Sequence, residues 1–210
     1  MSRPRLLDGC CAGGGAGTGY AEYFDVVGVD IEPQPHYPFE FVQADKRDVL
    51  ADRAFMNGFD AAGISPTCQS YANVTNWRGS NANHLDLLTP TLELLADVDI
   101  PWVVENVPEA AKHGPLRADL ILCGTQFDLP IKRHRAFQFG NWSFFDLQPP
   151  CRCYRNPAVR AFEHKDERAY ADAMGCTWMP KETARQAIPP AYTRYIGRAL
   201  LAHLQAREAA

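Results

Sequence analysis

Residues 5–30 carry the pattern from which the fold is predicted, and they read RLLDGCCAGGGAGTGYAEYFDVVGVD. A short apolar run, Leu6-Leu7, enters a glycine-rich loop, residues 21–24 are typical of the tail of a helix, and a β-branched run then ends at Asp30. Glycine allows positive φ angles and lets the backbone approach a ligand closely. We therefore predict a strand, a glycine loop that opens a short helix, and a second strand.

Strand and helix signals continue to alternate along the chain. Further strands are expected in "FEFVQADKRDV", ending near Asp45, and in "FDAAGI", "IPWVVENVPE" and "ADLILCGTQFDLP". A helix is expected over residues 84–98, where Leu85, Leu88, Leu92 and Leu95 follow helical spacing. This alternation predicts an α/β fold with a doubly wound, mostly parallel sheet. A closing helix in residues 187–210 would place Tyr195, Leu200 and Leu204 on its apolar face.

Residues 140–180 follow neither period and are rich in proline, arginine and aromatic side chains. They predict a small irregular insertion or recognition segment. The charge is also uneven, because residues 131–168 hold eight Lys/Arg against four acids while the whole chain carries −4. A solvated charged surface explains such asymmetry, and so does a polyanion-binding footprint.

The bulk composition bounds the class of protein. The 210 residues, with 46% hydrophobic and 22% charged, suit one globular domain. No apolar run approaches the roughly 20 residues that span a bilayer, and "MSRPRLLDG" leaves no room for a signal peptide. The seven cysteines are odd in number and have no disulfide-framework spacing. We expect a cytoplasmic protein.

The glycine loop and the acids at the strand ends are typical of a nucleoside site. Asp8 and the loop residues Gly13 and Gly14 precede Asp30, whose carboxylate would take two ribose hydroxyls. Asp45 lies where an adenine ring would be held. The alternative is simply a tight turn between a strand and a helix, since the glycines do not fit the strict dinucleotide pattern.

"SPTCQS", residues 65–70, puts Cys68 on a turn at the carboxyl end of a predicted core strand. Chemistry in α/β folds gathers at that end, which favours a nucleophile over an inert buried thiol. Glu105 follows four apolar residues, so partial desolvation would raise its pKa toward that of a proton donor; the alternative is an ordinary solvated acid.

Two further groups have alternatives. Arg133 and Arg135 in "IKRHRAF" would point the same way in an extended chain and clamp a base or phosphates, or else they belong to a solvated edge strand. Cys151, Cys153, His164 and Cys176 could hold zinc, but their spacings match no standard finger, and we expect no metal.

In chain order these motifs resemble the DNA (cytosine-5)-methyltransferase family. "LLDGCCAGGG" looks like its cofactor motif, "SPTCQS" its Pro-Pro-Cys-Gln motif, "ENV" at residues 105–107 its glutamate motif, "RHR" at 133–135 its arginine motif, and "QAIPPAYTRYIG" its closing motif. The short format looks most like methylases of actinobacterial phages.

The resemblance implies a Rossmann-like methyltransferase fold, S-adenosylmethionine as cofactor, S-adenosylhomocysteine as product and duplex DNA with a flipped cytosine as partner. Cys68 would attack carbon 6, Glu105 would assist at ring nitrogen 3, and Arg133 and Arg135 would hold the base. The implied cofactor residues are Asp8, Cys10, Gly13, Gly14, Asp30, Ile31, Asp45, Pro66, Gln186 and Ala187. It also implies a catalytic part over residues 1–139, a reduced target-recognition segment over 140–184 and a returning motif and helix over 185–210.

The sequence departs from the family pattern at several positions. Thr67 replaces the usual proline, Ala12 the first glycine and Cys10 the usual phenylalanine, and Arg185-Gln186 stand where Gly-Asn is usual. Two alternatives therefore stay open: an inactive DNA-binding protein, and the same chemistry on RNA or a free cytidine nucleotide. A specificity partner or an oligomer would fit the short recognition segment.

Overall fold

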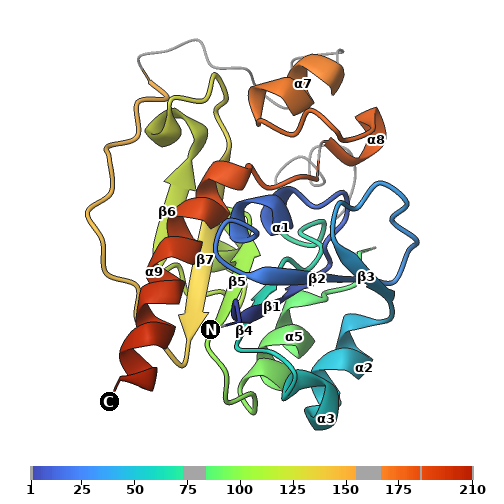
Figure 1. Cartoon of the computed structure of the whole chain (residues 1–210). Coiled ribbons are helices and arrows are strands. Elements are labelled where there is room, and N and C mark those ends of the chain that lie inside the picture. Colours follow the sequence, from blue (N-terminus) through green and yellow to red (C-terminus); the bar gives the residue numbers. More distant parts are fainter. Residues whose placement is uncertain (1, 73–83, 155–166, 185, 210) are drawn as a thin grey trace.

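The computed structural model describes residues 2–72, 84–154, 167–184 and 186–209. Seven strands form one sheet in the order β3-β2-β1-β4-β5-β7-β6 (Figure 1). The strands are β1 (Arg5–Gly9), β2 (Asp25–Asp30), β3 (Glu40–Gln43), β4 (Ala61–Ile64), β5 (Trp102–Asn106), β6 (Leu120–Cys123) and β7 (His134–Gly140). The helices described are α1 (Gly15–Tyr20), α2 (Lys46–Ala51), α3 (Arg53–Met56), α5 (Leu88–Leu95), α6 (Pro108–His113), the 3₁₀ helix η2 (Gly124–Phe127), α7 (Glu167–Ala173), α8 (Lys181–Ala184) and α9 (Pro190–Glu208).

The sheet is parallel except at one strand. β1 pairs in parallel with β2 and β4, whereas β7 runs antiparallel to both β5 and β6. The chain builds outward from β1 in one direction and then from β4 in the other, so the loops after β1 and β4 lie side by side. The predicted doubly wound α/β sheet is confirmed, and this point of reversal is where such sheets bind ligands.

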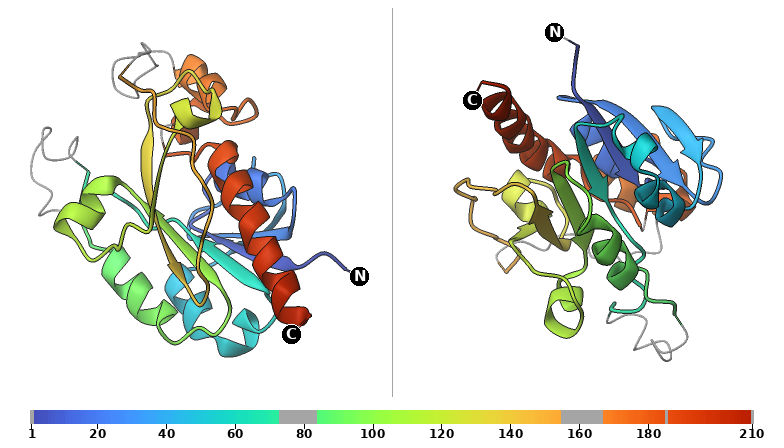
Figure 2. Two further views of the ribbon diagram at one scale, coloured as in Figure 1. Left: turned by 90° about the vertical axis from the view of Figure 1, so that its left-hand side faces the viewer. Right: turned by 90° about the horizontal axis from the view of Figure 1, so that it is seen from below.

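Helices cover both faces of the sheet because neighbouring residues of each strand point to opposite sides. Leu6 packs with α1 and α9 in one cluster, and Leu7 packs with α2 and α5 in another. The central strands β1, β2 and β4 carry buried apolar runs on both faces, as buried parallel strands require. Figure 2 shows the sheet from two further directions, with the long helix α9 along one side.

Three local predictions need correction. The helix expected over residues 84–98 begins only at Leu88, where the Asp86 side chain accepts a hydrogen bond from the Leu88 N–H (2.9 Å), and Leu85 is 71% exposed. Residues 21–23 form a turn after α1. The third strand ends at Gln43, and Asp45 instead caps α2 through the Arg47 N–H (2.8 Å).

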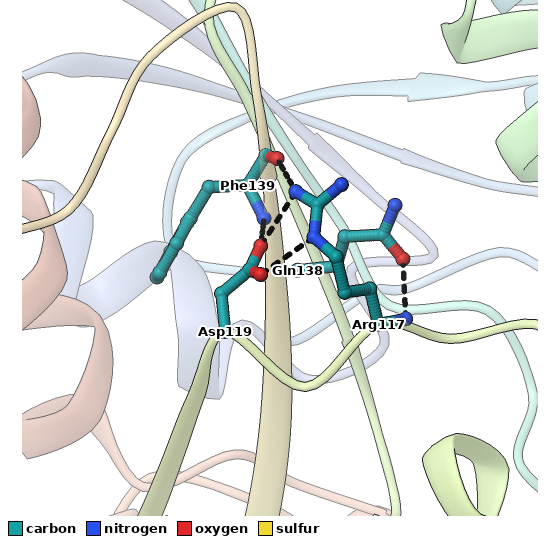
Figure 3. Close-up of polar contacts among 4 residues, drawn as sticks. All are labelled: Arg117, Asp119, Gln138 and Phe139. Carbon is teal, nitrogen blue, oxygen red and sulfur yellow. Dashed lines mark hydrogen bonds and ion pairs between the residues drawn. The ribbon is translucent and has the colours of Figure 1, made fainter.

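The alternative that placed "IKRHRAF" in a solvated edge strand is wrong. β7 lies between β5 and β6 and is paired on both sides. β6 and β7 form an antiparallel hairpin, and polar contacts stabilise the end where β6 begins and β7 ends (Figure 3). The guanidinium of Arg117 forms an ion pair with Asp119 (2.6 Å) and donates to the Phe139 carbonyl (2.7 Å). Asp119 also accepts from the Phe139 N–H (2.9 Å), and Gln138 accepts from the Arg117 N–H (2.8 Å).

The predicted irregular segment has structure at both described ends. Residues 141–154 leave β7, and Figure 1 shows them returning to the end of the sheet where β6 stops. Residues 167–184 contain α7 and α8 and form their own apolar cluster with Ile131. Among the described residues, no helix combines the length and the apolar character needed to cross a membrane.

Candidate active site at the reversal of the sheet

The loop after β1 is held over the end of β2 by backbone contacts. Cys10, Ala12 and Gly14 have φ angles of 58°, 43° and 82°, so the chain turns tightly in the left-handed region. The Ala12 N–H donates to the Asp30 carboxylate (3.0 Å), and the Cys11 N–H donates to the Val29 carbonyl (3.1 Å). The departures at positions 10 and 12 are therefore compatible with a tight loop.

A cavity of about 760 Å³ opens beside this loop. Its volume falls within the 300–1,000 Å³ typical of small-molecule sites. Four segments contribute to its lining: residues 10–13, 15 and 16 after β1; residues 30–32, 34 and 45–47 from the end of β2 onward; residues 65–69 after β4; and residues 179, 183 and 186–188 before α9, together with Leu85, Leu87, Glu105 and Arg135. Of the predicted site residues, the cavity brings together Cys68, Glu105, Arg135, Cys10, Gly13, Asp30, Ile31, Asp45, Pro66, Gln186 and Ala187.

The end of β2 offers the groups that a nucleoside needs. Asp30 uses one carboxylate oxygen for the Ala12 N–H and the other for the Glu32 N–H (3.1 Å). A carboxylate has about four lone-pair sites, so capacity is left for ribose hydroxyls. Ile31 follows at the cavity, and its apolar side chain is 60% exposed, which suits it to cover a ring. These residues fit an adenosyl ligand.

Asp45 fits the predicted role in holding adenine less well. Its carboxylate forms a bidentate contact with Arg47, at 3.1 Å to Nε and 2.6 Å to a terminal nitrogen. The hydrogen bonds from Arg47 lower the pKa of Asp45 to about 2. This carboxylate is thus already paired, and an incoming amino group would compete with a guanidinium.

Two predicted cofactor residues do not line the cavity. Asp8 is 1% exposed and accepts a hydrogen bond from the Tyr37 hydroxyl (3.0 Å). Gly14 is buried as the residue before α1, where an added Cβ would meet Pro38 at 2.8 Å. Both lie against Tyr37, which is 29 positions from Asp8 in the chain, an arrangement that no local motif reveals.

The turn that carries Cys68 lies where two motifs of the sequence meet. Cys68 follows β4 at the reversal of the sheet and lines the cavity. The buried Asn106 side chain donates to the Pro66 carbonyl (3.0 Å) and accepts from the Val107 N–H (2.9 Å). The two motifs that contain Cys68 and Glu105 are therefore fastened to each other through Asn106, which the sequence presented only as the middle residue of "ENV".

Glu105 and Arg135 form a largely buried ion pair at the cavity wall. Arg135 Nε lies 2.7 Å from Glu105 Oε1, and the two side chains are 14% and 10% exposed. Burial raises the pKa of Glu105, while Arg135 and Arg133 act in the opposite direction. Burial likewise raises the pKa of the Cys68 thiol, and the positive charge of Arg135 opposes that shift. The Glu105–Arg135 pair and the Cys68 thiol thus line the same cavity.

Arg133 lies away from the cavity. It is 5% exposed, donates to the Tyr170 hydroxyl and lies over the Tyr170 ring with 5.7 Å to the centroid. The Arg133 carbonyl accepts from the Tyr192 hydroxyl. The predicted pair of arginines therefore divides: Arg135 reaches the site, and Arg133 connects the β7 end to α7 and α9.

The chain segment before α9 closes the cavity from the opposite side. Trp178 donates its indole N–H to the Gly13 carbonyl (2.9 Å), and Met179 and Thr183 line the wall beside Gln186. Sequence analysis missed these three residues, because their partners lie about 165 positions earlier in the chain. The closing motif at residues 186–188 was the one local signal that this region returns to the site.

Cys151, Cys153, His164 and Cys176, the set that the sequence left as a possible zinc site, do not all lie together among the described residues, because Cys176 is apart from Cys151 and Cys153. His164 lies outside the described residues, and Cys176 is buried in the cluster with Tyr170 and Met174. Cys151 and Cys153 instead meet Cys123 and His134.

Comparisons with known proteins find only distant likenesses. No protein-family model matches the sequence, and no curated protein is significantly similar. Solved structures with a similar fold include a methyltransferase of Entamoeba histolytica (17% identity, 66% of this chain, 53% of that chain, TM-score 0.48). A second is Dnmt2 methyltransferase of S. pombe (20% identity, 68% of this chain, 54% of that chain, TM-score 0.44). A third is a DNMT2 mutant of Spodoptera frugiperda (16% identity, 64% of this chain, 48% of that chain, TM-score 0.47). The chain spans about half the length of these structures.

Proposed function

We propose that the protein is an S-adenosylmethionine-dependent cytosine-5 methyltransferase acting on DNA. The observation that carries the proposal is the meeting of Cys68, Glu105 and Arg135 in one cavity with the glycine loop and Asp30. A thiol, a buried acid and a nucleoside cradle are the three parts that this chemistry needs, and they come from strands that the fold reversal brings together.

The Asp30 carboxylate, the glycine loop and Ile31 would hold the adenosyl part of the cofactor. S-adenosylmethionine, when bound, supplies an electrophilic methyl group on a sulfonium sulfur. The Cys68 turn lies across the same cavity, so a cytosine placed between Cys68 and Glu105 would face that group. Trp178 and Met179 would exclude water from the cofactor side.

Cys68 acts as the nucleophile in this proposal. Its thiol would give its proton to solvent, and the sulfur would add to carbon 6 of the cytosine as the C5–C6 double bond opens. The electron pair at carbon 5 would then take the methyl group. Burial raises the pKa of the thiol, and the positive charge of Arg135 opposes that shift. The cytosine must therefore bind without moving Arg135 away from the thiol. After methylation, the carbon 5 proton would pass to water and the C6–S bond would break, which re-forms the C5–C6 double bond and releases the Cys68 thiolate.

Glu105 stabilises the charge that develops on the ring. Its carboxyl group, with a pKa raised by burial, donates a proton or hydrogen bond to ring nitrogen 3 as Cys68 attacks. Arg135 fixes the orientation of this acid through the 2.7 Å contact. The interaction is strongest in the transition state, so its loss should lower kcat.

A DNA acceptor is supported by the resemblance of the motifs and by the excess of basic residues between 131 and 168. A cytosine in a duplex must leave the stack to reach the Cys68 turn, at a cost of a few kcal/mol. The reduced recognition segment, residues 140–184, would read a short site or depend on a partner chain.

The test is covalent trapping on duplex DNA that contains 5-fluorocytosine, with S-adenosylmethionine present. Fluorine at carbon 5 blocks the final elimination, so the wild type should form a stable protein–DNA adduct that denaturing electrophoresis detects. Cys68→Ser should form none, while Cys176→Ser, which alters a thiol outside the cavity, should still form it.

Parallel reactions with tRNA and with the free nucleotide identify the acceptor. An adduct that forms on RNA alone would contradict the proposed DNA acceptor, but the proposed reaction at Cys68 would stand. Absence of adduct on all three acceptors, with S-adenosylhomocysteine still binding, would identify an inactive relative and refute the enzymatic proposal.

A further inference from the structure

A second cluster of chemically active side chains lies at the opposite end of the β6–β7 hairpin from the Figure 3 contacts. Cys123 ends β6, His134 begins β7, and the antiparallel register sets these two residues directly opposite each other. Cys151 and Cys153 arrive on the segment that returns from β7. The four possible ligand atoms all lie within 4.8 Å of one another.

The spacing of these atoms matches a tetrahedral metal site. The His134 Nε2 atom lies 3.5 Å from Cys151 Sγ and 3.9 Å from Cys153 Sγ. With a Zn–S bond near 2.3 Å and a Zn–N bond near 2.0–2.1 Å, tetrahedral geometry places a nitrogen and a sulfur about 3.6 Å apart. The cysteines of the cluster are free thiols rather than disulfides.

We propose that Cys123, His134, Cys151 and Cys153 bind one structural zinc ion. Three thiolates and one imidazole form a closed four-ligand set of the kind that zinc prefers, with no position left for water or substrate. On binding, each cysteine thiol exchanges its S–H bond for an S–Zn bond and releases its proton to solvent. No oxidant or reductant is needed.

Neighbouring polar groups support the ligands. The Thr125 hydroxyl lies 3.4 Å from Cys123 Sγ and 3.6 Å from Cys151 Sγ, and it accepts a hydrogen bond from the Arg152 N–H (3.1 Å). Outer contacts of this type fix the orientation of metal ligands. Thr125 is itself buried at the start of η2, and Cys123 and His134 lie at strand ends, so Cys151 and Cys153 on the returning segment meet a partner side that belongs to regular elements.

The position gives the metal a clear role. His134 immediately precedes Arg135, which reaches the catalytic cavity. The metal would pin residues 151–153 to the strand end that carries Arg135, in addition to the hydrogen bond from Gln126 to the Pro149 carbonyl (2.7 Å). The zinc would therefore anchor the irregular segment beside the site without entering the reaction.

Elemental analysis of the full chain, purified without chelator, tests the proposal. Wild type should hold about one zinc ion per chain, as a single four-ligand site requires. Cys151→Ser and Cys153→Ser, at half-exposed positions, should lose it. Cys176→Ser is the matched control, because it removes a cysteine of the sequence-based set that lies outside the cluster, and it should keep the zinc.

A second measurement needs no variant. In wild type, Cys123, Cys151 and Cys153 should resist alkylation until a strong chelator is added, and Co²⁺ substitution should give thiolate charge-transfer bands with intense tetrahedral d–d absorption. A metal-free wild type, a native Cys151–Cys153 disulfide, or zinc lost in Cys176→Ser but kept in Cys151→Ser would each overturn the proposal. None of these measurements depends on methyl transfer, so this proposal and the proposed function fail separately.

Discussion

Asp8 lies at the carboxyl end of β1 and is almost fully buried under the glycine loop. Burial raises its pKa to about 7, against hydrogen bonds from Tyr37 and Gly17 that act the other way. In the unfolded chain the group should titrate near its ordinary value of 3.8. Between these two values the folded protein binds the extra proton, so stability should fall as the pH rises through this window.

Asp8→Asn keeps the shape of the side chain and stays neutral at every pH, so it should remove this pH-dependent loss of stability. Between pH 5 and pH 8 the wild type should lose on the order of 3 kcal/mol of unfolding free energy relative to the variant. Urea unfolding at several pH values measures it, with the exposed Asp99→Asn as control. Parallel pH curves for wild type and Asp8→Asn would show that Asp8 titrates normally in the fold.

Glu105 is the second residue whose burial has a chemical consequence. Glu105→Gln keeps an amide that can still contact Arg135 but cannot give up a proton. On the proposed mechanism kcat should fall about 10²–10⁴-fold, the range of a lost general acid. Single-turnover methyl transfer from labelled cofactor measures it. Glu93→Gln, on the exposed side of α5, should leave the rate unchanged, and an equal rate for Glu105→Gln would remove the acid from the mechanism.

At the scale of elements, α1 and α9 pack so closely that backbone meets backbone. A Cβ on Gly19 would lie 2.1 Å from the Pro190 carbonyl oxygen and 2.1 Å from Thr193 Oγ1. The Thr193 hydroxyl donates to the Ala16 carbonyl (2.7 Å), which holds the two helices at this distance. The contact also positions residues 186–188, which enter the cavity just before α9.

Gly19→Ala should therefore cost about 3 kcal/mol, the upper end for overpacking, because the Pro190 carbonyl oxygen and the Arg194 nitrogen that the methyl group would meet belong to the backbone of α9. Gly175→Ala is the matched control: its φ is 77° but its added methyl meets nothing within 4 Å, so only the left-handed strain of about 1–2 kcal/mol remains. Chemical denaturation of both variants separates the two effects. If Gly19→Ala is no less stable than wild type, α9 does not pack as described.

The sequence could predict those features of the site that depend on residues adjacent in the chain. The glycine loop, the strand end at Asp30, and the turn that carries Cys68 depend on adjacent residues, and the structure places them around one cavity. The division between Arg133 and Arg135 depends on Tyr170, 37 positions away. The contact between Cys123 and Cys151 depends on the register of the strands and on a segment that returns from β7. The spacing of cysteines along the sequence cannot predict either of these.

At the scale of the whole molecule, the cavity joins segments that lie far apart in the chain. Its walls come from the loop after β1, the ends of β2 and β4, and residues 179, 183 and 186–188 before α9. The Trp178–Gly13 hydrogen bond already links the two ends of this arrangement. A ligand that touches all of these segments binds only the folded chain and so stabilises it as a unit.

S-adenosylhomocysteine at about 100 times its Kd should add about 2.7 kcal/mol to the unfolding free energy. For a chain of this size that corresponds to a rise in Tm of roughly 5–10 °C. Asp30→Ala removes the carboxylate at the end of β2 and should abolish most of the rise, whatever it does to the ligand-free Tm. Asp99→Asn should show the full rise, since it lies on the surface away from the cavity walls. The same ligand-induced rise in wild type and Asp30→Ala would mean that the adenosyl group does not lie at the end of β2. The proposed position of the methyl group relative to Cys68 would then be wrong.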